Sequence, residues 1–269
     1  MQFPLLRAAA LVIVGNAALA GREVSAFAGS SLFRFSKEVE FVVPLGAEKY
    51  EQVAADPLAW FAWLKARRCR GLRMHRAPME EKPGRPGHIE ERMLVGFVGG
   101  GPRWLIEAVG EGVSDVWEGY DRVGDRDEVG RIWLTAYVRL GEMPPEDDVD
   151  ADVAGAAAGL GAALDDIIVL AGKFQSAPFD GLFKQAKATL DGLAPKQPPP
   201  DFEALADLGA AARRLLAAAQ TVWVFGGMGS WNDTGPDAEL APEYERTSEA
   251  LFQAIVRAMR VVANSTYAG

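Results

Sequence analysis

The feature that most constrains the fold is a change in hydrophobic pattern near residue 140. Before it, residues 32–43 alternate, with Phe33, Phe35 and Val39 on one face of an extended chain and polar residues on the other. This alternation is typical of a strand with one buried face. After residue 140, apolar residues recur at spacings of three and four, which is typical of amphipathic helices. We therefore expect an α+β fold, with an antiparallel β-sheet in the N-terminal half packed against a helical C-terminal half.

The charged residues divide at the same point. Residues 1–140 carry 19 basic and 18 acidic side chains, whereas residues 141–269 carry 9 and 19. Between the halves, residues 141–148 combine adjacent prolines with a run of acidic residues, as linkers often do. We expect a β-rich lobe with one or two helices over residues 1–140. An acidic helical lobe over residues 141–269 should pack on it to form one globular unit.

Local signals place further elements in each half. Asp56 can cap a helix that starts at Pro57 and ends near residues 69–71, and residues 99–102 suit a turn between two strands. Besides the alternating segment, we expect strands at residues 88–98, 103–109 and 131–140. In the second half we expect helices at residues 152–174, 179–190, 201–224 and 242–264.

Residues 1–20 allow two interpretations. The apolar run over residues 8–14, followed by Gly15 and Asn16, predicts a buried strand and a hairpin turn. The small residues near the end of the segment resemble a signal-peptidase site, but Arg7 is its only basic residue, which argues against a secretory signal. We favour the strand and a cytoplasmic location. If residues 1–20 are a cleaved signal, the protein is secreted or periplasmic instead.

Composition excludes several functions. The formal net charge is −9 at pH 7, so nucleic acid is a disfavoured partner because its phosphates would be repelled. With Cys69 as the one cysteine and two histidines, His75 and His88, we expect no disulfide, no metal site and no cofactor. Because no apolar run is as long as the roughly 18 residues of a transmembrane helix, no membrane span is expected.

The glycine-rich segment from Gly226 to Asp233 is the most unusual stretch of the chain. A phosphate-binding loop should open a helix directly, but here the loop continues, and no complete nucleotide motif is present. A structural loop that follows a helix end is the favoured interpretation. The third interpretation is a functional loop that presents Trp231, Asn232 and Asp233 to a ligand.

The strand expected at residues 131–140 has an aliphatic face and a second face that carries Arg131, Trp133, Thr135, Tyr137 and Arg139. Arginine and aromatic rings together can hold a planar ligand or anchor a protein interface. The simpler interpretation is that the rings lie under a helix with their polar atoms at its rim. Residues 65–76 are strongly basic, and we expect the acidic half of the same molecule or solvent to neutralise them.

The functional prediction is a non-catalytic binding protein that engages a partner protein, such as an inhibitor or immunity-like protein directed at a basic partner. Its binding residues would be Arg131, Trp133, Tyr137, Arg139, Trp231, Asn232 and Asp233. The alternative is an enzyme that binds a small molecule. In that case Glu107, Glu118 or Asp233 would act as acid or base, and the loop at residues 226–229 would close the pocket. No catalytic set is evident in the sequence, so we favour the non-enzymatic function.

Overall fold

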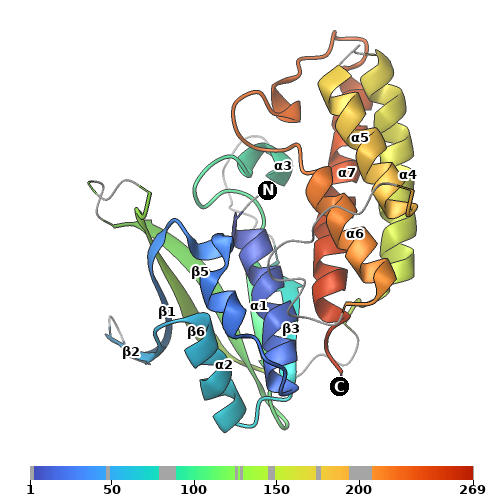
Figure 1. The fold of residues 1–269 in the computed structure, drawn as a ribbon. Coiled ribbons are helices and arrows are strands. Elements are labelled where there is room, and N and C mark those ends of the chain that lie inside the picture. The colour runs from blue at the N-terminus through green and yellow to red at the C-terminus, as the bar shows by residue number, and fades with distance from the viewer. Residues whose placement is uncertain are drawn as a thin grey trace.

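The computed structural model describes residues 3–46, 49–78, 89–124, 127, 130–144, 149–173, 177–193 and 208–268. The strands drawn in Figure 1 are β1 (Ser36–Gly46), β2 (Lys49–Ala54), β3 (Gly71–Arg76), β4 (Trp104–Val109), β5 (Ser114–Val123) and β6 (Trp133–Met143). The helices are α1 (Phe3–Leu19), α2 (Pro57–Ala66), α3 (Glu91–Leu94), α4 (Val153–Lys173), α5 (Ala177–Leu190), α6 (Ala210–Thr221) and α7 (Ala241–Asn264). Short 3₁₀ helices occur at η1 (Ser25–Gly29), η2 (Ser31–Phe33) and η4 (Trp231–Asp233).

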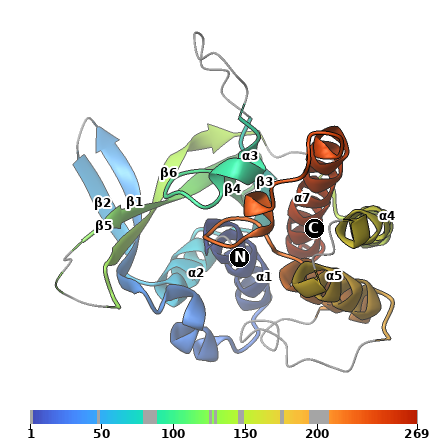
Figure 2. The ribbon, with the colours of Figure 1, turned by 90° about the horizontal axis from the view of Figure 1, so that it is seen from above.

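The predicted α+β fold is confirmed. The strands form one sheet in the order β2-β1-β6-β5-β4-β3, and every neighbouring pair is antiparallel except β1 and β6, which are parallel. Helices α1 and α2 lie on one face of this sheet, and α4 to α7 form a bundle beside its β3 edge (Figure 2). We call the face that α1 and α2 cover the inner face.

The segment predicted to be a buried first strand is instead helix α1, so that prediction was wrong. All residues from Ala8 to Val14 are buried. A helix that is apolar on every side has no amphipathic period, so the sequence did not distinguish it from a strand. Gly15 is not in a turn: a Cβ atom there would lie 2.4 Å from Leu72 Cδ1, so it gives β3 room to approach the helix.

Other boundaries also differ from the expectations. The strand predicted at residues 88–98 is wrong for its described residues, because α3 and a loop occupy that stretch, while His88 lies outside the described residues. Strand β1 starts at Ser36, later than predicted. The helices at residues 152–174, 179–190 and 242–264 are observed as α4, α5 and α7, whereas α6 covers only part of residues 201–224. Residues 201–207 of that last helix lie outside the described residues. The predicted linker at residues 141–148 is wrong at its start, because β6 continues to Met143, and its residues 145–148 lie outside the described residues.

Three strands that the sequence did not indicate are β2, β3 and β5.

Strand β3 has charged residues between its buried ones, and its outer edge is completed by two asparagines. Asn16 Nδ2 donates to the Leu72 carbonyl at 2.9 Å, and the Leu72 amide donates to Asn16 Oδ1 at 2.6 Å. Asn264 on α7 makes the same two bonds to Met74, at 3.1 Å and 2.6 Å. Side-chain amides thus pair with the edge that a further strand would otherwise occupy.

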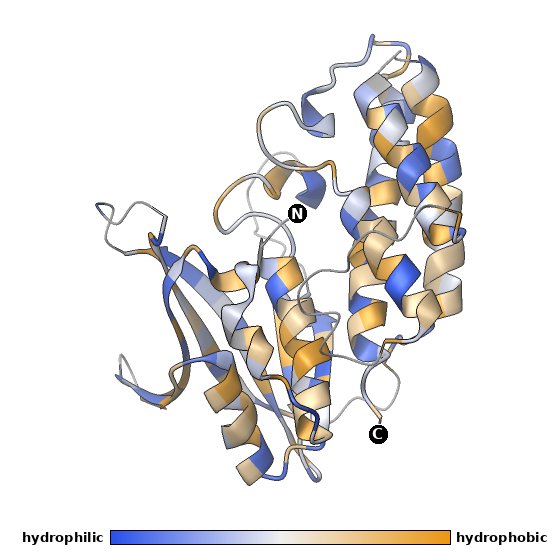
Figure 3. Ribbon diagram, viewed as in Figure 1, coloured by the Kyte–Doolittle hydropathy of each residue, from blue (hydrophilic) through white to orange (hydrophobic). Residues whose placement is uncertain are grey.

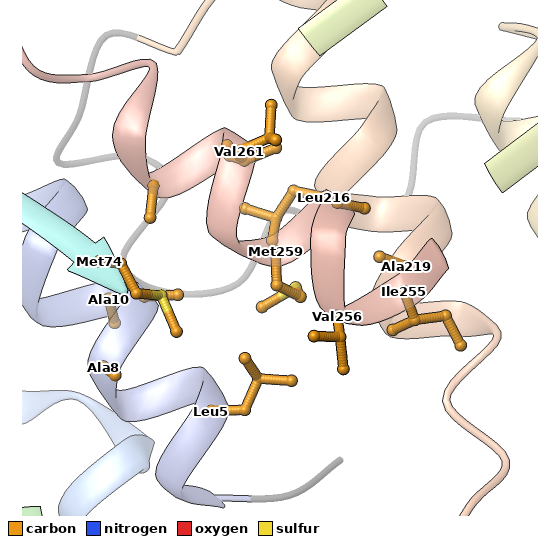
Figure 4. Packing of buried hydrophobic residues seen from close by; sticks show 14 of the residues in the cluster. Leu5, Ala8, Ala10, Met74, Leu216, Ala219, Ile255, Val256, Met259 and Val261 are labelled. Atoms are coloured by element: carbon orange, nitrogen blue, oxygen red, sulfur yellow. The ribbon is translucent and has the colours of Figure 1, made fainter. Parts of the chain in front are cut away.

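The buried apolar residues form one cluster that draws on both halves of the chain. Figure 3 shows apolar residues along α1 and on the bundle helices. In Figure 4, Leu5 of α1 and Met74 of β3 lie toward Met259 and Val256 of α7, with Leu216 of α6 behind them. The cluster therefore has α1 at its centre, between the sheet and the bundle.

Candidate functional site

A pocket of about 530 Å³ opens between the inner face of the sheet, the amino end of α1 and two loops. The amino end of α1 lies close to α3 in both ribbon views (Figures 1 and 2). The lining residues come from α1, the residue before β1, the start of β4, β5, β6, the loop between α3 and β4, and the loop that follows α6. They include Arg7, Phe35, Gly96, Phe97, Arg103, Trp104, Glu118, Gly119, Tyr120, Asp121, Trp133, Thr135, Tyr137, Trp223, Phe225, Gly226 and Gly227.

The pocket exists because β5 is longer than its neighbour β4. Strand β4 begins at Trp104, and its next residue, Leu105, pairs with Glu118 of β5. Beyond that pair, β5 continues to Val123, and β6 is the one described strand that pairs with it there. Gly119, Tyr120 and Asp121 line the pocket in this extension.

The floor of the pocket carries an ion pair. Arg7 Nη1 donates to Asp121 Oδ1 at 2.8 Å, with the two side chains 4% and 22% exposed. Arg7 Nη2 donates to Ser36 Oγ at 3.1 Å, and Thr135 Oγ1 donates to the same Asp121 Oδ1 at 2.6 Å. A buried charge is costly unless it is paired and hydrogen-bonded, so this network holds the guanidinium in a low-dielectric site.

A second ion pair lies at the rim. Arg103 donates from Nε and Nη2 to the two oxygens of Glu118, each at 2.7 Å, and the Tyr120 hydroxyl donates to Glu118 Oε2 at 2.6 Å. Burial by itself would raise the pKa of Glu118, but the hydrogen bonds from Arg103 and Tyr120 outweigh it and lower the pKa. Burial and the bond to Glu118 raise the pKa of Tyr120 to about 12. Glu118 is therefore an ionised acceptor at neutral pH and Tyr120 a protonated donor.

Tyr137 is held rigidly in the wall. Its side chain is 4% exposed, and its ring stacks on Phe41 with the centroids 5.0 Å apart. It lies across from Gly119, where a Cβ atom would be 2.8 Å from Tyr137 Cε1. Burial raises the pKa of Tyr137 far above its usual range, so the hydroxyl remains a donor. Among the described residues, this hydroxyl has no hydrogen-bond partner.

Two loops close the pocket and contact one another through glycines. Gly226 has a φ of 79°, and a Cβ atom there would be 3.0 Å from the amide nitrogen of Gly96. The loops are also joined by reciprocal bonds: Arg92 Nη1 donates to Asn232 Oδ1 at 3.0 Å, and Asn232 Nδ2 donates to the Arg92 carbonyl at 2.7 Å. Arg92 is fully buried and pairs with Glu245 of α7. The bundle thereby fixes both loops.

The structure brings some of the sequence-predicted binding residues together. Trp133 and Tyr137 line the pocket alongside Gly226 and Gly227. Their face of β6 is the inner one, whereas the aliphatic face of β6 is partly exposed, with Leu140 47% exposed.

The remaining predicted binding residues do not line the pocket. Arg139 pairs with Asp115 and Glu142, and Arg131 lies within hydrogen-bond distance of the Lys37 carbonyl. Trp231 is fully buried and donates through Nε1 to Ser248 Oγ at 2.7 Å. Asn232 joins the loops, and Asp233 accepts from the backbone amides of Gly229 and Ser230. These contacts stabilise the conformation of the loop that follows α6.

The candidate acids and bases are also separated. Glu118 lines the pocket, but Glu107 lies in a different cluster, where it accepts from Ser114 Oγ at 2.7 Å and contacts His75 Nε2 at 2.8 Å. In the basic segment, Arg73 lies 3.8 Å from Glu107, Arg76 pairs with Glu91, and Arg67 stacks on Trp63.

Sequence reasoning missed Arg7, Asp121 and Arg103. A usable signal was present for Arg7, because an arginine in an otherwise apolar helix must find an anionic partner when the helix is buried. Asp121 and Arg103 gave no such signal, since their positions depend on strand pairing far from them in sequence.

The described residues contain no group of three or more His, Cys, Asp or Glu side chains that could hold a metal ion. Of the described helices, α4 alone is long and apolar enough to cross a membrane. One such helix is a weak indication, because core helices pass the same test. No family model matches the chain, and comparisons with curated proteins and with solved structures give no match either.

Proposed function

We propose that the protein binds a small molecule in the pocket beside β5 and does not transform it. The observation that carries this proposal is the hydroxyl of Tyr137, a fixed donor in an aromatic-walled pocket that has no hydrogen-bond partner among the described residues. Small-molecule sites are typically concave and mostly apolar, with a few fixed polar groups and a volume of roughly 300–1,000 Å³. The pocket, at about 530 Å³, has these properties.

The charged groups favour binding over catalysis. Both carboxylates of the lining, Glu118 and Asp121, are ion-paired with arginines. An efficient general acid or base has a pKa near the working pH, whereas the pKa of Glu118 is lowered and that of Tyr120 is raised to about 12. These groups are suited to hydrogen bonding with a ligand and poorly suited to proton transfer.

The test is a thermal-shift screen of a small-molecule library against the full chain, because a ligand of the folded state raises the unfolding temperature. Trp133→Ala removes one wall of the pocket and should weaken binding of any hit about tenfold. Trp63→Ala is the matched control, since Trp63 is also half-buried but lies on α2 outside the pocket. A library without hits, or hits that bind equally to Trp133→Ala and the control, would contradict the proposal.

A second function, engagement of a partner protein, is favoured by one observation. Phe97, Val98 and Met228 are 71%, 73% and 104% exposed, on the two loops that meet at Gly96 and Gly226. Adjacent exposed apolar residues are frequent at protein interfaces. Under this proposal, Phe97→Ser should reduce capture of a partner while Trp133→Ala retains it. If both variants capture the partner as well as the natural chain does, these loops are not part of the interface.

A further inference from the structure

The polar groups of the pocket specify what kind of molecule it would accept, and this step rests on the proposed function. The charged residues of the lining are two arginines and two carboxylates, joined in the pairs Arg7–Asp121 and Arg103–Glu118. The described residues of the lining therefore carry no net formal charge. A ligand with a net charge would lose its hydration without gaining an unpaired counter-ion, so an uncharged molecule is favoured.

The walls favour a flat molecule. Eight of the described residues that line the pocket are aromatic: Phe35, Phe97, Trp104, Tyr120, Trp133, Tyr137, Trp223 and Phe225. Aromatic rings pack well against one another in offset or edge-to-face arrangements. The glycines at positions 96, 119 and 226 add no side chains to the space, and the Tyr137 ring lies against the backbone at Gly119.

Two polar atoms on the floor make no hydrogen bond within the part of the chain that the structure describes. The Tyr137 hydroxyl is a donor without a partner, and Asp121 accepts both of its hydrogen bonds at Oδ1, which leaves Oδ2 as an acceptor. The two residues project from the same face, because Asp121 pairs with Thr135 and Gly119 pairs with Tyr137. Such diagonal neighbours are about 7–8 Å apart, within reach of a common ligand, and no side chain at Gly119 separates them.

We infer that the pocket recognises an uncharged planar heterocycle in which a carbonyl group lies beside an N–H group, as in a cyclic amide. The carbonyl accepts from the Tyr137 hydroxyl, and the N–H donates to Asp121 Oδ2. The aromatic walls hold the two faces of the ring.

The experiment compares four related probes by calorimetry with the full chain. Carbostyril has the required edge, N-methylcarbostyril lacks the donor, quinoline lacks both the donor and the carbonyl, and quinaldate carries a negative charge. Carbostyril should bind most tightly, with a loss of about tenfold or more for each of the other three, since each loses at least one hydrogen bond or buries an uncompensated charge. Equal or tighter binding of quinaldate or N-methylcarbostyril would overturn the inference.

A protein variant provides the second arm. Tyr137→Phe keeps the stacked ring and removes the hydroxyl, so it should weaken carbostyril about three- to tenfold and leave the affinity for quinoline unchanged. Tyr50→Phe, on exposed β2, is the control and should change neither. An unchanged affinity of Tyr137→Phe for carbostyril would refute the hydroxyl contact. If library hits bind at the pocket but carbostyril does not, the ligand class is wrong and the proposed function stands; if nothing binds there, both fail.

Discussion

At the scale of single residues, the pocket depends on a charge that is placed inside the core. Arg7 is 3% exposed on a helix that is otherwise buried and apolar, and four different residues accept from its guanidinium. The guanidinium joins α1 to β5, to β6 and to the segment that precedes β1. The same network that neutralises Arg7 also orients Asp121 in the pocket floor.

Replacing Arg7 tests this network. Arg7→Met keeps the apolar stem but removes the guanidinium that pairs with Asp121 and donates to Ser36 and Thr135, so the free energy of unfolding should fall by about 3 kcal/mol. Urea denaturation followed by circular dichroism measures this change. Arg70→Met, at an exposed position, should change it by less than about 0.5 kcal/mol. A loss as small as that of the control would show that the network does not stabilise the fold.

Glu107 makes stability depend on pH. Burial would raise the pKa of Glu107, but the hydrogen bonds from His75 and Ser114 outweigh it and lower the pKa in the folded state. A carboxyl group with a lower pKa in the folded than in the unfolded state stabilises the protein at neutral pH. That contribution is lost as the pH falls through the folded-state pKa.

Glu107→Gln should therefore lower the free energy of unfolding by about 2 kcal/mol at neutral pH. The difference in free energy of unfolding between Glu107→Gln and the natural chain should shrink in acid, below the ordinary pKa of 4.5. There the natural carboxyl group is protonated and uncharged, as the glutamine amide is. Urea titrations at several pH values measure both effects, and Glu111→Gln on an exposed turn is the control. A difference that stays constant with pH would argue against ionised Glu107 as the cause.

At the scale of elements, the edge of β3 shows how a helical half and a sheet are joined. Asn16 of α1 and Asn264 of α7 each bond to both the amide and the carbonyl of one β3 residue. Both asparagines are buried. They therefore close the sheet edge and attach it to two helices at once, which a further strand could not do.

Asn264→Ala should leave the Met74 amide and carbonyl buried without partners, at a cost of about 2 kcal/mol in the free energy of unfolding. The Met74 amide should exchange with solvent faster in this variant, as measured by hydrogen-exchange NMR. Asn264→Asp retains an oxygen that accepts from the Met74 amide, so this variant should protect that amide partly from exchange. Unchanged exchange at Met74 in Asn264→Ala would show that the edge has another partner.

At the scale of the whole molecule, α1 is the element that both halves share. It contacts α2, β3, β4 and α7, and every residue from Ala8 to Val14 is buried. Removing it would expose the inner face of the sheet and one side of α7. We expect a chain that starts at Gly21 to lose cooperative unfolding and near-ultraviolet circular dichroism and to become sensitive to protease. A truncated chain that folds as the full chain does would show that α1 is dispensable.

The sequence by itself determined the elements whose signals are local. Asp56 accepts from the Ala59 amide and caps α2 as predicted, and the helical spacing of α4, α5 and α7 needs only neighbouring residues to be recognised. The alternation in β6 likewise indicated that Trp133 and Tyr137 share a face. These features follow from backbone geometry within one element, where periods of two and 3.6 residues are readable.

Only the tertiary structure decided which face of β6 is buried, that residues 3–19 form a helix, and that β1 lies parallel to β6. Each depends on partners distant in sequence. The aromatic face turned inward because Phe41 and Trp60 stack above Tyr137, and the apolar N-terminal segment could be a helix because both halves supplied surfaces to surround it. The pocket arose in the same way, since the length by which β5 exceeds β4 is a property of their pairing and of neither strand alone.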